Sequence, residues 1–215
     1  MVIQHVPPFL VPKILNTKIH FHEAGSDVAI WKLKDDSLFT CASAWELTRQ
    51  KKNKNIIITF SWHKNIPFKI SFLLWRALRG KLPINEKIRT FGGEPVRCHC
   101  CIKSGWDDIN HIFVTGNFAT YNWKYYVAFF GISHRHMPLG NLLMDWWGGK
   151  PKNSAHKLLL QAVPIIVCWI LWKNRCSSKY GGKKSSILRV KFLIFNDTTQ
   201  LMSTVFPYIQ WPNSW

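Results

Sequence analysis

Acidic side chains are scarce in this chain of 215 residues. Aspartate and glutamate together number 11, against 29 lysines and arginines, so the formal net charge at neutral pH is +18. A field of that sign attracts polyanions, and we expect nucleic acid to be the partner. The same scarcity excludes chemistry that needs clustered carboxylates: the Tyr/Phe-x-Asp-Asp signature of a polymerase is absent, and no four-carboxylate ribonuclease H set can be assembled.

The chain also lacks a hydrophobic run long enough to predict a membrane span. The most apolar stretch, Leu158 to Trp172, contains Gln161 and Pro164 and is shorter than the roughly 20 apolar residues that a span needs. We interpret it as a buried helix and expect no membrane association. Residues 1–20 hold neither an uninterrupted apolar core nor the cleavage pattern of a secretory signal. We therefore expect an intracellular protein, nuclear or cytoplasmic and not secreted.

Motifs of common enzyme classes are missing as well. The sequence has no Gly-x-Ser-x-Gly elbow, no phosphate-binding loop and no His-Glu-x-x-His pair. We expect a protein without catalytic residues.

The six cysteines are unevenly spread, and three of them fall within four positions: Cys98, Cys100 and Cys101. Such crowding is typical of metal ligation rather than of a disulfide framework. Cys98 and Cys101 can fill two corners of a tetrahedral Zn²⁺ site, and His111, about ten positions later, a third. The fourth ligand should follow within a few residues, but no cysteine follows His111 there. A working site with another fourth ligand and a decayed site both remain open.

Apolar spacing predicts a mainly α fold of several amphipathic helices around a Cys/His loop that resembles a zinc knuckle. The clearest helix is Pro67–Arg79, which carries Phe68, Phe72 and Trp75 on one face. We expect these three rings to be buried against the helix that follows the Cys/His loop, Trp123 included. The remaining expected helices are Ala44–Gln50 with Ser43 as its cap and Glu46 in a capping box, Pro83–Arg89, Phe118–Phe130, Leu139–Trp147, Ala155–Lys179 kinked at Pro164, and Ser186–Val205.

One element of another kind is expected near the N-terminus. Two short apolar runs, Ile30–Leu33 and Leu38–Cys41, flank the turn-forming triplet Asp35-Asp36-Ser37. This pattern predicts a short β-hairpin.

Several phrases of the sequence together resemble the zinc-binding region that follows the polymerase domain in plant LINE-type (non-LTR) retrotransposon reverse transcriptases. They are Asp27-Val-Ala-Ile-Trp31, Asp36-Ser-Leu-Phe-Thr40, Ser43-Ala-Trp45-Glu-Leu47, Ile66-Pro-Phe-Lys-Ile-Ser-Phe-Leu-Leu-Trp-Arg-Ala-Leu-Arg-Gly-Lys-Leu-Pro83, Cys98-x2-Cys101 and His111-Ile-Phe113. Trp169-Ile-Leu-Trp-Lys-Asn-Arg-Cys176 is similar to the helical connector that leads toward a ribonuclease H domain in those polyproteins.

The resemblance assigns roles to individual residues. Cys98 and Cys101 take the two thiolate positions and His111 the imidazole position, while His99 stands where the family has proline. Asp107 and Asp108 take the acidic and polar positions just before the histidine. Gly116 stands where the family has its fourth ligand, a cysteine. Losing one of four structural ligands removes most of a site's affinity, so the resemblance implies a degenerate zinc site.

The resemblance also implies an organisation and a function. Residues 1–25 would form an irregular leader, 26–135 the zinc-binding module and 136–215 a helical connector. The function would be that of a non-catalytic retrotransposon-derived fragment that associates with RNA or single-stranded DNA, with the polymerase and ribonuclease H domains of the parent element as further partners. The expected phosphate contacts are Arg76, Arg79, Lys81, Lys87, Arg89 and Arg97. An inert spacer or pseudogene product and a domesticated protein-interaction module remain as alternatives.

Overall fold

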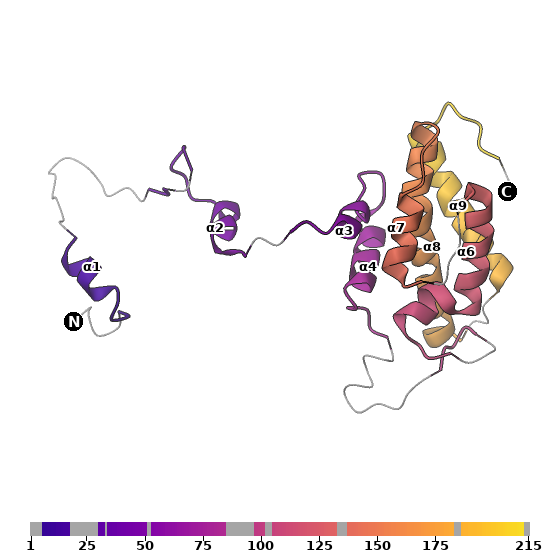
Figure 1. Ribbon diagram of the computed structural model, residues 1–215, viewed down its shortest axis with the longest axis horizontal. Coiled ribbons are helices and arrows are strands. Elements are labelled where there is room, and N and C mark those ends of the chain that lie inside the picture. Colours follow the sequence, from indigo (N-terminus) through magenta and orange to yellow (C-terminus); the bar gives the residue numbers. More distant parts are fainter. Residues whose placement is uncertain are drawn as a thin grey trace. The chain divides into compact units, whose positions relative to one another are not determined.

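The computed structural model describes residues 6–17, 30–32, 34–50, 53–84, 97–101, 105–132, 137–182 and 186–212. Within these ranges the regular secondary structure is helical, and no strand is present (Figure 1). The chain divides into two compact units, Met1–Lys52 and Asn53–Trp215. The mainly α class is therefore confirmed. The predicted helix Pro83–Arg89 lies outside the described residues beyond Ile84.

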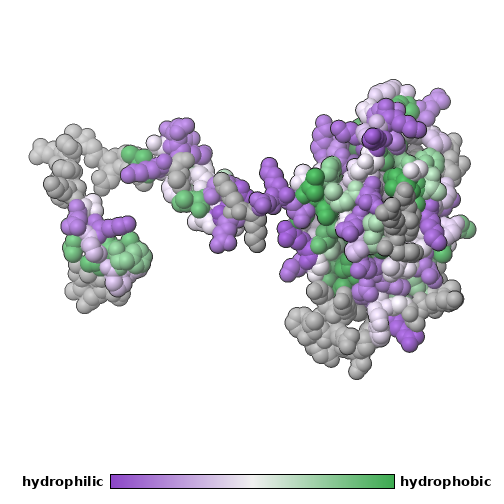
Figure 2. Space-filling view, viewed as in Figure 1, coloured by the Kyte–Doolittle hydropathy of each residue, from purple (hydrophilic) through white to green (hydrophobic). Residues whose placement is uncertain are grey.

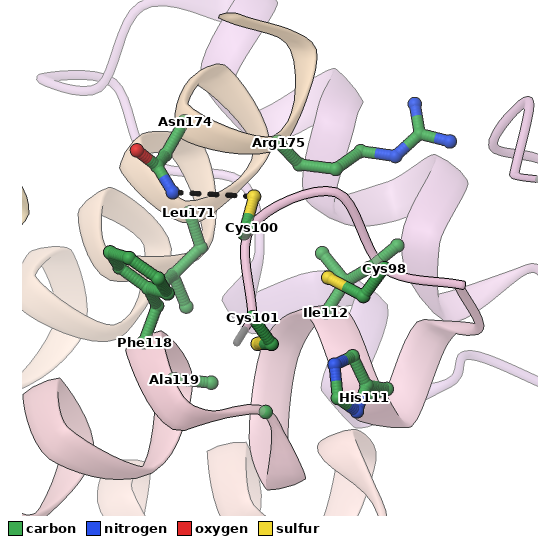
Figure 3. A pocket seen from close by; sticks show the side chains of 11 residues that line it. Cys98, Cys100, Cys101, His111, Ile112, Phe118, Ala119, Leu171, Asn174 and Arg175 are labelled. Atoms are coloured by element: carbon green, nitrogen blue, oxygen red, sulfur yellow. Dashed lines mark hydrogen bonds between the residues drawn. The ribbon is translucent and has the colours of Figure 1, made fainter. Parts of the chain in front are cut away.

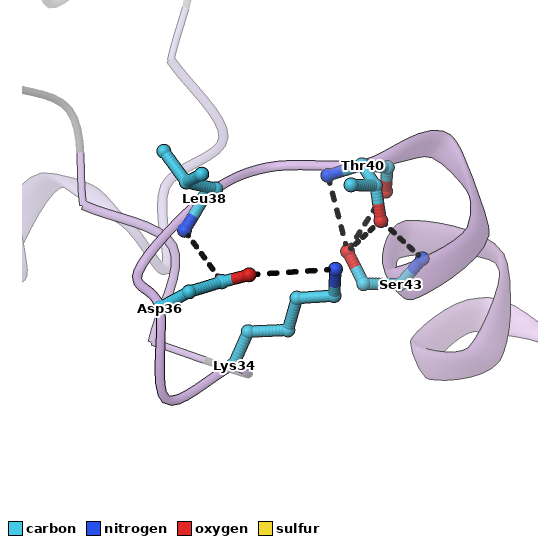
Figure 4. A network of polar contacts seen from close by, with 5 residues as sticks. All are labelled: Lys34, Asp36, Leu38, Thr40 and Ser43. Atoms are coloured by element: carbon cyan, nitrogen blue, oxygen red, sulfur yellow. Dashed lines mark hydrogen bonds and ion pairs between the residues drawn. The ribbon is translucent and has the colours of Figure 1, made fainter.

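The predicted N-terminal hairpin is wrong. Instead of pairing with a second strand, the backbone turns: the amide of Trp31 donates to the carbonyl of Ser37 at 3.0 Å, and Ser37 adopts a positive φ of 56°. Asp36 supports this turn by accepting from the amide of Leu38 at 3.0 Å and by pairing with Lys34 at 3.8 Å (Figure 4). Side-chain hydrogen bonds of this kind compete with a strand ladder, and here they prevail.

The residues expected to form the second strand lead into a helix. In the first unit the helices are α1 (Val11–Leu15) and α2 (Cys41–Thr48). Thr40, in extended conformation, caps α2: its hydroxyl accepts from the amide of Ser43 at 3.1 Å, and the Ser43 hydroxyl accepts from the amide of Thr40 at 3.3 Å (Figure 4). Ser43 is therefore the third helical residue rather than the cap that the sequence predicted, and α2 begins earlier. Glu46, expected in the capping box, instead pairs with Arg49 at 2.7 Å.

The second unit is a helical bundle organised around one long helix. Its elements are α3 (Ile56–Phe60), α4 (Phe68–Leu78), the π-helical turn η2 (His111–Thr115), α6 (Asn117–Phe130), α7 (Leu139–Trp147), α8 (Ser154–Tyr180) and α9 (Ile187–Val205). Helix α8 contacts α4, η2, α6, α7 and α9, so it forms the centre of the bundle (Figure 1). The predicted helices that correspond to α4, α6, α7, α8 and α9 are confirmed to within two residues at each end, whereas the short helix α3 was not expected.

By length and composition α8 is apolar enough to cross a membrane, and among the described helices it alone passes that test. However, 67% of its most apolar window is buried inside the unit, as in the core helix of a bundle. Pro164 lies within this helix and is itself buried. The absence of membrane association stays a prediction.

The sequence predicted the wrong buried face for α4. Phe68 is 70% exposed and Phe72 is 39% exposed, whereas the buried residues include Ile70, Leu74 and Ala77. The helix carries two apolar stripes, one aromatic and one aliphatic, and the aliphatic stripe packs in the core with α4 against α8. Trp123 is fully buried, as expected, but its ring meets Trp146 at 5.5 Å between centroids and not the aromatic stripe of α4.

Candidate metal centre

The cysteine-bearing loop is held by backbone pairing at its base. Arg97 and Trp106 form an isolated antiparallel bridge, and the amide of Cys98 donates to the carbonyl of Gly105 at 2.9 Å. This pairing brings the two ends of the loop together. The side chains of Cys98 and Cys101 therefore lie close to His111 at the start of η2. Residues 102–104 of this loop, between Cys101 and Gly105, lie outside the described ranges.

His111 is positioned by the turn in which it stands. It is the first residue of η2, where its amide donates to Oδ1 of Asp108 at 2.7 Å. The amide of Gly116 then donates to the His111 carbonyl at 2.8 Å, which is the wider i to i+5 bond of a π-helical turn. Such turns are rare and frequent at functional sites, because the extra residue redirects the side chains that flank it.

Together these elements bring Cys98, Cys101 and His111 to one point. Their ligand atoms all lie within 4.8 Å of one another (Figure 3). A tetrahedral zinc with Zn–S bonds of about 2.3 Å and Zn–N bonds of about 2.0 Å holds its ligand atoms roughly 3.3–3.8 Å apart, so a small inward movement of the three side chains suffices. The trio predicted from spacing is thus assembled in space.

Two further observations fit a metal ion at this point. Nε2 of His111 is buried and has no hydrogen-bond partner in the described structure. A buried polar atom without a partner is costly, and coordination would satisfy it. A cavity of about 20 Å³, lined by the trio together with Gly116 and Ala119, opens beside it. That volume suits one ion or one water molecule, so the donor set and the space both fit zinc.

The three groups also perturb one another's protonation. Hydrogen bonds from the thiols of Cys100 and Cys101, with a smaller one from His111, hold the pKa of Cys98 below its ordinary value. The contact with Cys98 in turn raises the pKa of Cys101 and the pKa of His111. The contacts within the trio therefore favour the thiolate form of Cys98. Zinc binds thiolates and neutral imidazole, so metal binding at this trio displaces protons.

Two glycines make room for the imidazole of His111. A Cβ on Gly105 would overlap Nδ1 and Cε1 of the ring. At Gly116 a Cβ would lie 3.1 Å from Nε2 of the ring, and it would overlap the His111 carbonyl oxygen. The position where the resemblance expects a fourth cysteine thus faces the centre, but the turn beside it is closed too tightly for a side chain. The sequence alone gave no reason to single out Gly105.

Two neighbours of the trio lie outside the cluster. Cys100 is not part of the set within 4.8 Å, and its sulfur accepts from Nδ2 of Asn174 at 3.5 Å (Figure 3). His99 is exposed at the surface of the loop. The described residues therefore offer three protein ligands at this point.

A buried ion pair fastens the loop to α8, and spacing along the sequence could not reveal it. The guanidinium of Arg175 donates to both carboxylate oxygens of Asp107, through Nε to Oδ1 at 3.1 Å and through Nη2 to Oδ2. Arg175 is 1% exposed and Asp107 is 2% exposed. The Arg175 guanidinium also lies 4.9 Å from the ring centroid of Trp172. The metal loop is thus tied to a helix that begins more than forty residues after His111.

The basic residues predicted for phosphate contacts are placed only in part. Arg76 donates through Nε and Nη2 to the carbonyl of Lys81, at 3.1 and 2.7 Å, and so closes the end of α4. Arg79, Lys81 and Arg97 are exposed. Lys87 and Arg89 lie outside the described residues. The role of this set in binding nucleic acid stays a prediction.

Comparison with known families agrees with the chemistry of the trio. Residues 39–123 match the family model described as zinc-binding in reverse transcriptase. The matched region includes α4 and all three ligands, and it ends at Trp123 within α6. No curated protein and no solved structure matches the chain. The predicted resemblance is confirmed at the level of a reverse-transcriptase zinc-binding region, whereas its LINE type and plant origin stay predictions.

Proposed function

We propose that this chain is a non-catalytic fragment derived from a plant LINE-type retrotransposon, in which it serves as a zinc-binding module that associates with nucleic acid. One observation carries the proposal: Cys98, Cys101 and His111 bring their ligand atoms within 4.8 Å of one another, inside the region that matches the reverse-transcriptase zinc-binding family. Zinc held there would link the cysteine loop to η2, and it would act as a structural cross-link.

Zinc binding is weakened in this chain, because Gly116 offers no side-chain ligand where the family has cysteine. A three-ligand site keeps a coordination position for water. Catalytic zinc is held in the same way, but a catalytic site also needs a general base near that water. Asp107 is paired with Arg175, and the Asp108 carboxylate accepts from the backbone amide of His111, which supports a structural role for both acids.

Association with nucleic acid rests on charge. The +18 net charge favours a polyanion, and its effect is independent of base sequence. Fluorescence anisotropy with a single-stranded oligonucleotide should therefore show binding at low salt that weakens steeply toward physiological salt. No binding at low salt would leave an inert spacer as the better description.

The zinc part is tested by metal titration of the purified chain. Cobalt is a useful probe, because thiolate coordination gives it an absorption band that reports sulfur ligands, and zinc then competes it away. We expect one weakly held metal per chain, lost in Cys98→Ser and in His111→Ala. Cys41→Ser is the matched control, since Cys41 is exposed in the first unit. Equal cobalt binding by wild type and Cys98→Ser would refute the proposed centre.

The same titration separates the degenerate site from a complete one. Tight zinc binding by the wild type, lost in Cys100→Ser or His99→Ala, would mean that one of these residues moves to supply a fourth ligand. That result would overturn the degenerate site and leave the zinc-binding function in place.

A further inference from the structure

An aromatic ladder begins just before α4 and runs along it, exposed at its first three rings and half-buried at its last. It consists of Trp62, Phe68, Phe72 and Trp75, whose rings follow one another at centroid distances of 5.4, 5.5 and 5.5 Å. The Phe68–Phe72 and Phe72–Trp75 pairs are stacked, at interplanar angles of 14° and 16°. Phe68 is 70% exposed, which is unusual for a large ring in the middle of such a series. The core does not use this face, because α4 buries its aliphatic stripe instead.

The segment that carries the ladder has charged side chains of one sign. Residues 53–84 contain no aspartate or glutamate but six cations, namely Lys54, Lys64, Lys69, Arg76, Arg79 and Lys81. By helical spacing, Lys69 and Arg76 follow one edge of the ladder, and Arg79 continues its line one turn beyond Trp75. Figure 2 shows hydrophobic and hydrophilic residues intermixed on the face that carries α3 and α4.

Lysines of α8 lie near the start of this edge. Next to Trp62, burial and then the charges of Lys64 and Lys157 hold the pKa of His63 below its ordinary value, so Lys157 of α8 adds to the positive potential there. Near Lys69, the ring of Trp169 has the ammonium groups of Lys69 and Lys173 at 5.8 and 5.3 Å from its centroid. Lys69, Trp169 and Lys173 line a groove of about 530 Å³ between the start of α4, α8 and α9. Asp197 of α9 also lines this groove and pairs with Lys173 at 3.6 Å, so Lys69 is the cation that the groove leaves to a phosphate.

We propose that the aromatic ladder and the cations along its edge form the docking surface for single-stranded nucleic acid. This inference rests on the proposed association with nucleic acid and names the surface responsible. Unpaired bases stack on exposed rings irrespective of their identity, while lysine and arginine contact the phosphates that link them. In a duplex the bases are already stacked on one another and cannot stack on these rings, so the surface selects single strands. The charge complementarity favours a polyanion over an apolar protein partner.

The first experiment separates stacking from charge. Binding of an oligothymidine of about 12 nucleotides is compared with that of an abasic strand of equal length and charge. The wild type should prefer the strand with bases. Phe68→Ala and Phe72→Ala should each weaken oligothymidine binding by about 5- to 140-fold, the range that loss of one stacked base implies. They should leave binding of the abasic strand unchanged.

Controls exist for both parts of the surface. Phe129→Ala on α6 removes a ring of comparable exposure, 54%, away from the ladder and should bind as the wild type does. Lys69→Gln should lower the slope of log K against log salt by about 1, whereas Arg79→Gln tests the far end of the ladder in the same way. Because Phe68 is so exposed, Phe68→Ala should melt at the temperature of the wild type, so a loss of binding would not reflect unfolding.

The outcomes distinguish this inference from the function on which it rests. If wild type binds oligothymidine and the two phenylalanine variants bind equally well, the ladder is not the surface, although nucleic-acid association stands. Equal affinity for the abasic strand would likewise overturn stacking. If the wild type binds no single strand at low salt, both the ladder and nucleic-acid association fail, and an acidic protein partner becomes the occupant to test. The zinc titration is unaffected by any of these results.

Discussion

The imidazole ring of His111 packs directly against Gly105, where any side chain would occupy the space of the ring. A Cβ there would overlap the ring at Nδ1 and Cε1, and the ring has no flexible end that could yield. We expect Gly105→Ala to displace His111 and to reduce cobalt and zinc affinity at least about tenfold, as loss of one ligand does. The metal titration measures this. Gly140→Ala is a suitable control, because the nearest atom to a Cβ there is Cδ1 of Ile57, at an ordinary contact distance of 3.5 Å. Unchanged metal affinity in Gly105→Ala would show that His111 is not a ligand.

Position 116 tests whether one added ligand is enough to form a four-ligand zinc site. We expect Gly116→Cys to add a fourth ligand that faces Nε2 of His111 and to tighten zinc binding at least about tenfold. Without zinc the variant should be less stable by about 1–3 kcal/mol, because its Cβ must open the π-helical turn. Gly116→Ala is the matched control: it carries the same overlap and the same loss of stability, but it gains no zinc affinity. Thermal melts with and without zinc measure both effects. If Gly116→Cys binds zinc no better than Gly116→Ala, the turn itself no longer supports a four-ligand site.

At the residue scale the sequence predicted well which three side chains come together and poorly what supports them; their role as zinc ligands stays a prediction. Cys98, Cys101 and His111 were found because zinc ligation imposes a spacing that local sequence displays. The contact of Gly105 with the imidazole and the Asp107–Arg175 pair were not predicted, because they depend on how the loop folds back and on a helix far along the chain.

Among the elements, α4 shows why helical periodicity alone can assign the wrong face. Its aromatic and aliphatic stripes both repeat at helical spacing, and burial follows which of them fits against α8. We expect Leu74→Ala to lower the free energy of unfolding by about 2–5 kcal/mol, because Leu74 is fully buried. Phe72→Ala should change it by less than about 1 kcal/mol. Chemical denaturation of the two variants decides the point. A larger loss for Phe72→Ala than for Leu74→Ala would restore the aromatic stripe as the buried face.

The buried Asp107–Arg175 ion pair links the cysteine loop to α8. Removing the carboxylate in Asp107→Ala leaves the buried guanidinium of Arg175 without its partner, which should cost about 3–5 kcal/mol of stability. Metal affinity should fall as well, because the loop loses its attachment. The double variant Asp107→Leu with Arg175→Met, which buries no charge, should recover much of the stability. Equal stability of the wild type and Asp107→Ala in a denaturant titration would mean that this pair does not hold the loop.

Helices were predicted best where a long apolar pattern and clear stop signals coincide, as in α6 to α9. The N-terminal hairpin failed for the opposite reason. Leu38 to Cys41 is short, and the side chains of Asp36, Thr40 and Ser43 provide hydrogen bonds that form a turn and a helix cap instead. Helix α3 was missed because Ile56-Ile-Ile-Thr-Phe60 is rich in β-branched residues, while the cap that starts it comes from the side chain of Asn55.

At the scale of the whole molecule, the predicted boundary between the zinc-binding region and the C-terminal helices differs from the extent of the compact unit. The sequence predicted a module that ends at residue 135, and the family match ends at residue 123. Yet the compact unit runs from Asn53 to Trp215, and α8 contacts α4, η2 and α6 within it. The resemblance to a family therefore covers the metal ligands without covering the core on which they rest.

Truncation tests this directly. A fragment of residues 53–215 should melt cooperatively and keep the metal affinity of the full chain, because it retains the whole second unit. A fragment of residues 53–135 lacks α7 to α9, so it exposes the aliphatic stripe of α4 and leaves Asp107 without Arg175. We expect it to show no cooperative transition by circular dichroism and to bind zinc no better than an unfolded Cys/His peptide. If it instead melts cooperatively and holds one zinc as tightly as the longer fragment, the predicted boundary at residue 135 is correct. The C-terminal helices would then be a connector that packs on a module already folded. Otherwise α8 is part of the zinc-binding module, because Arg175 orders the loop that carries its ligands.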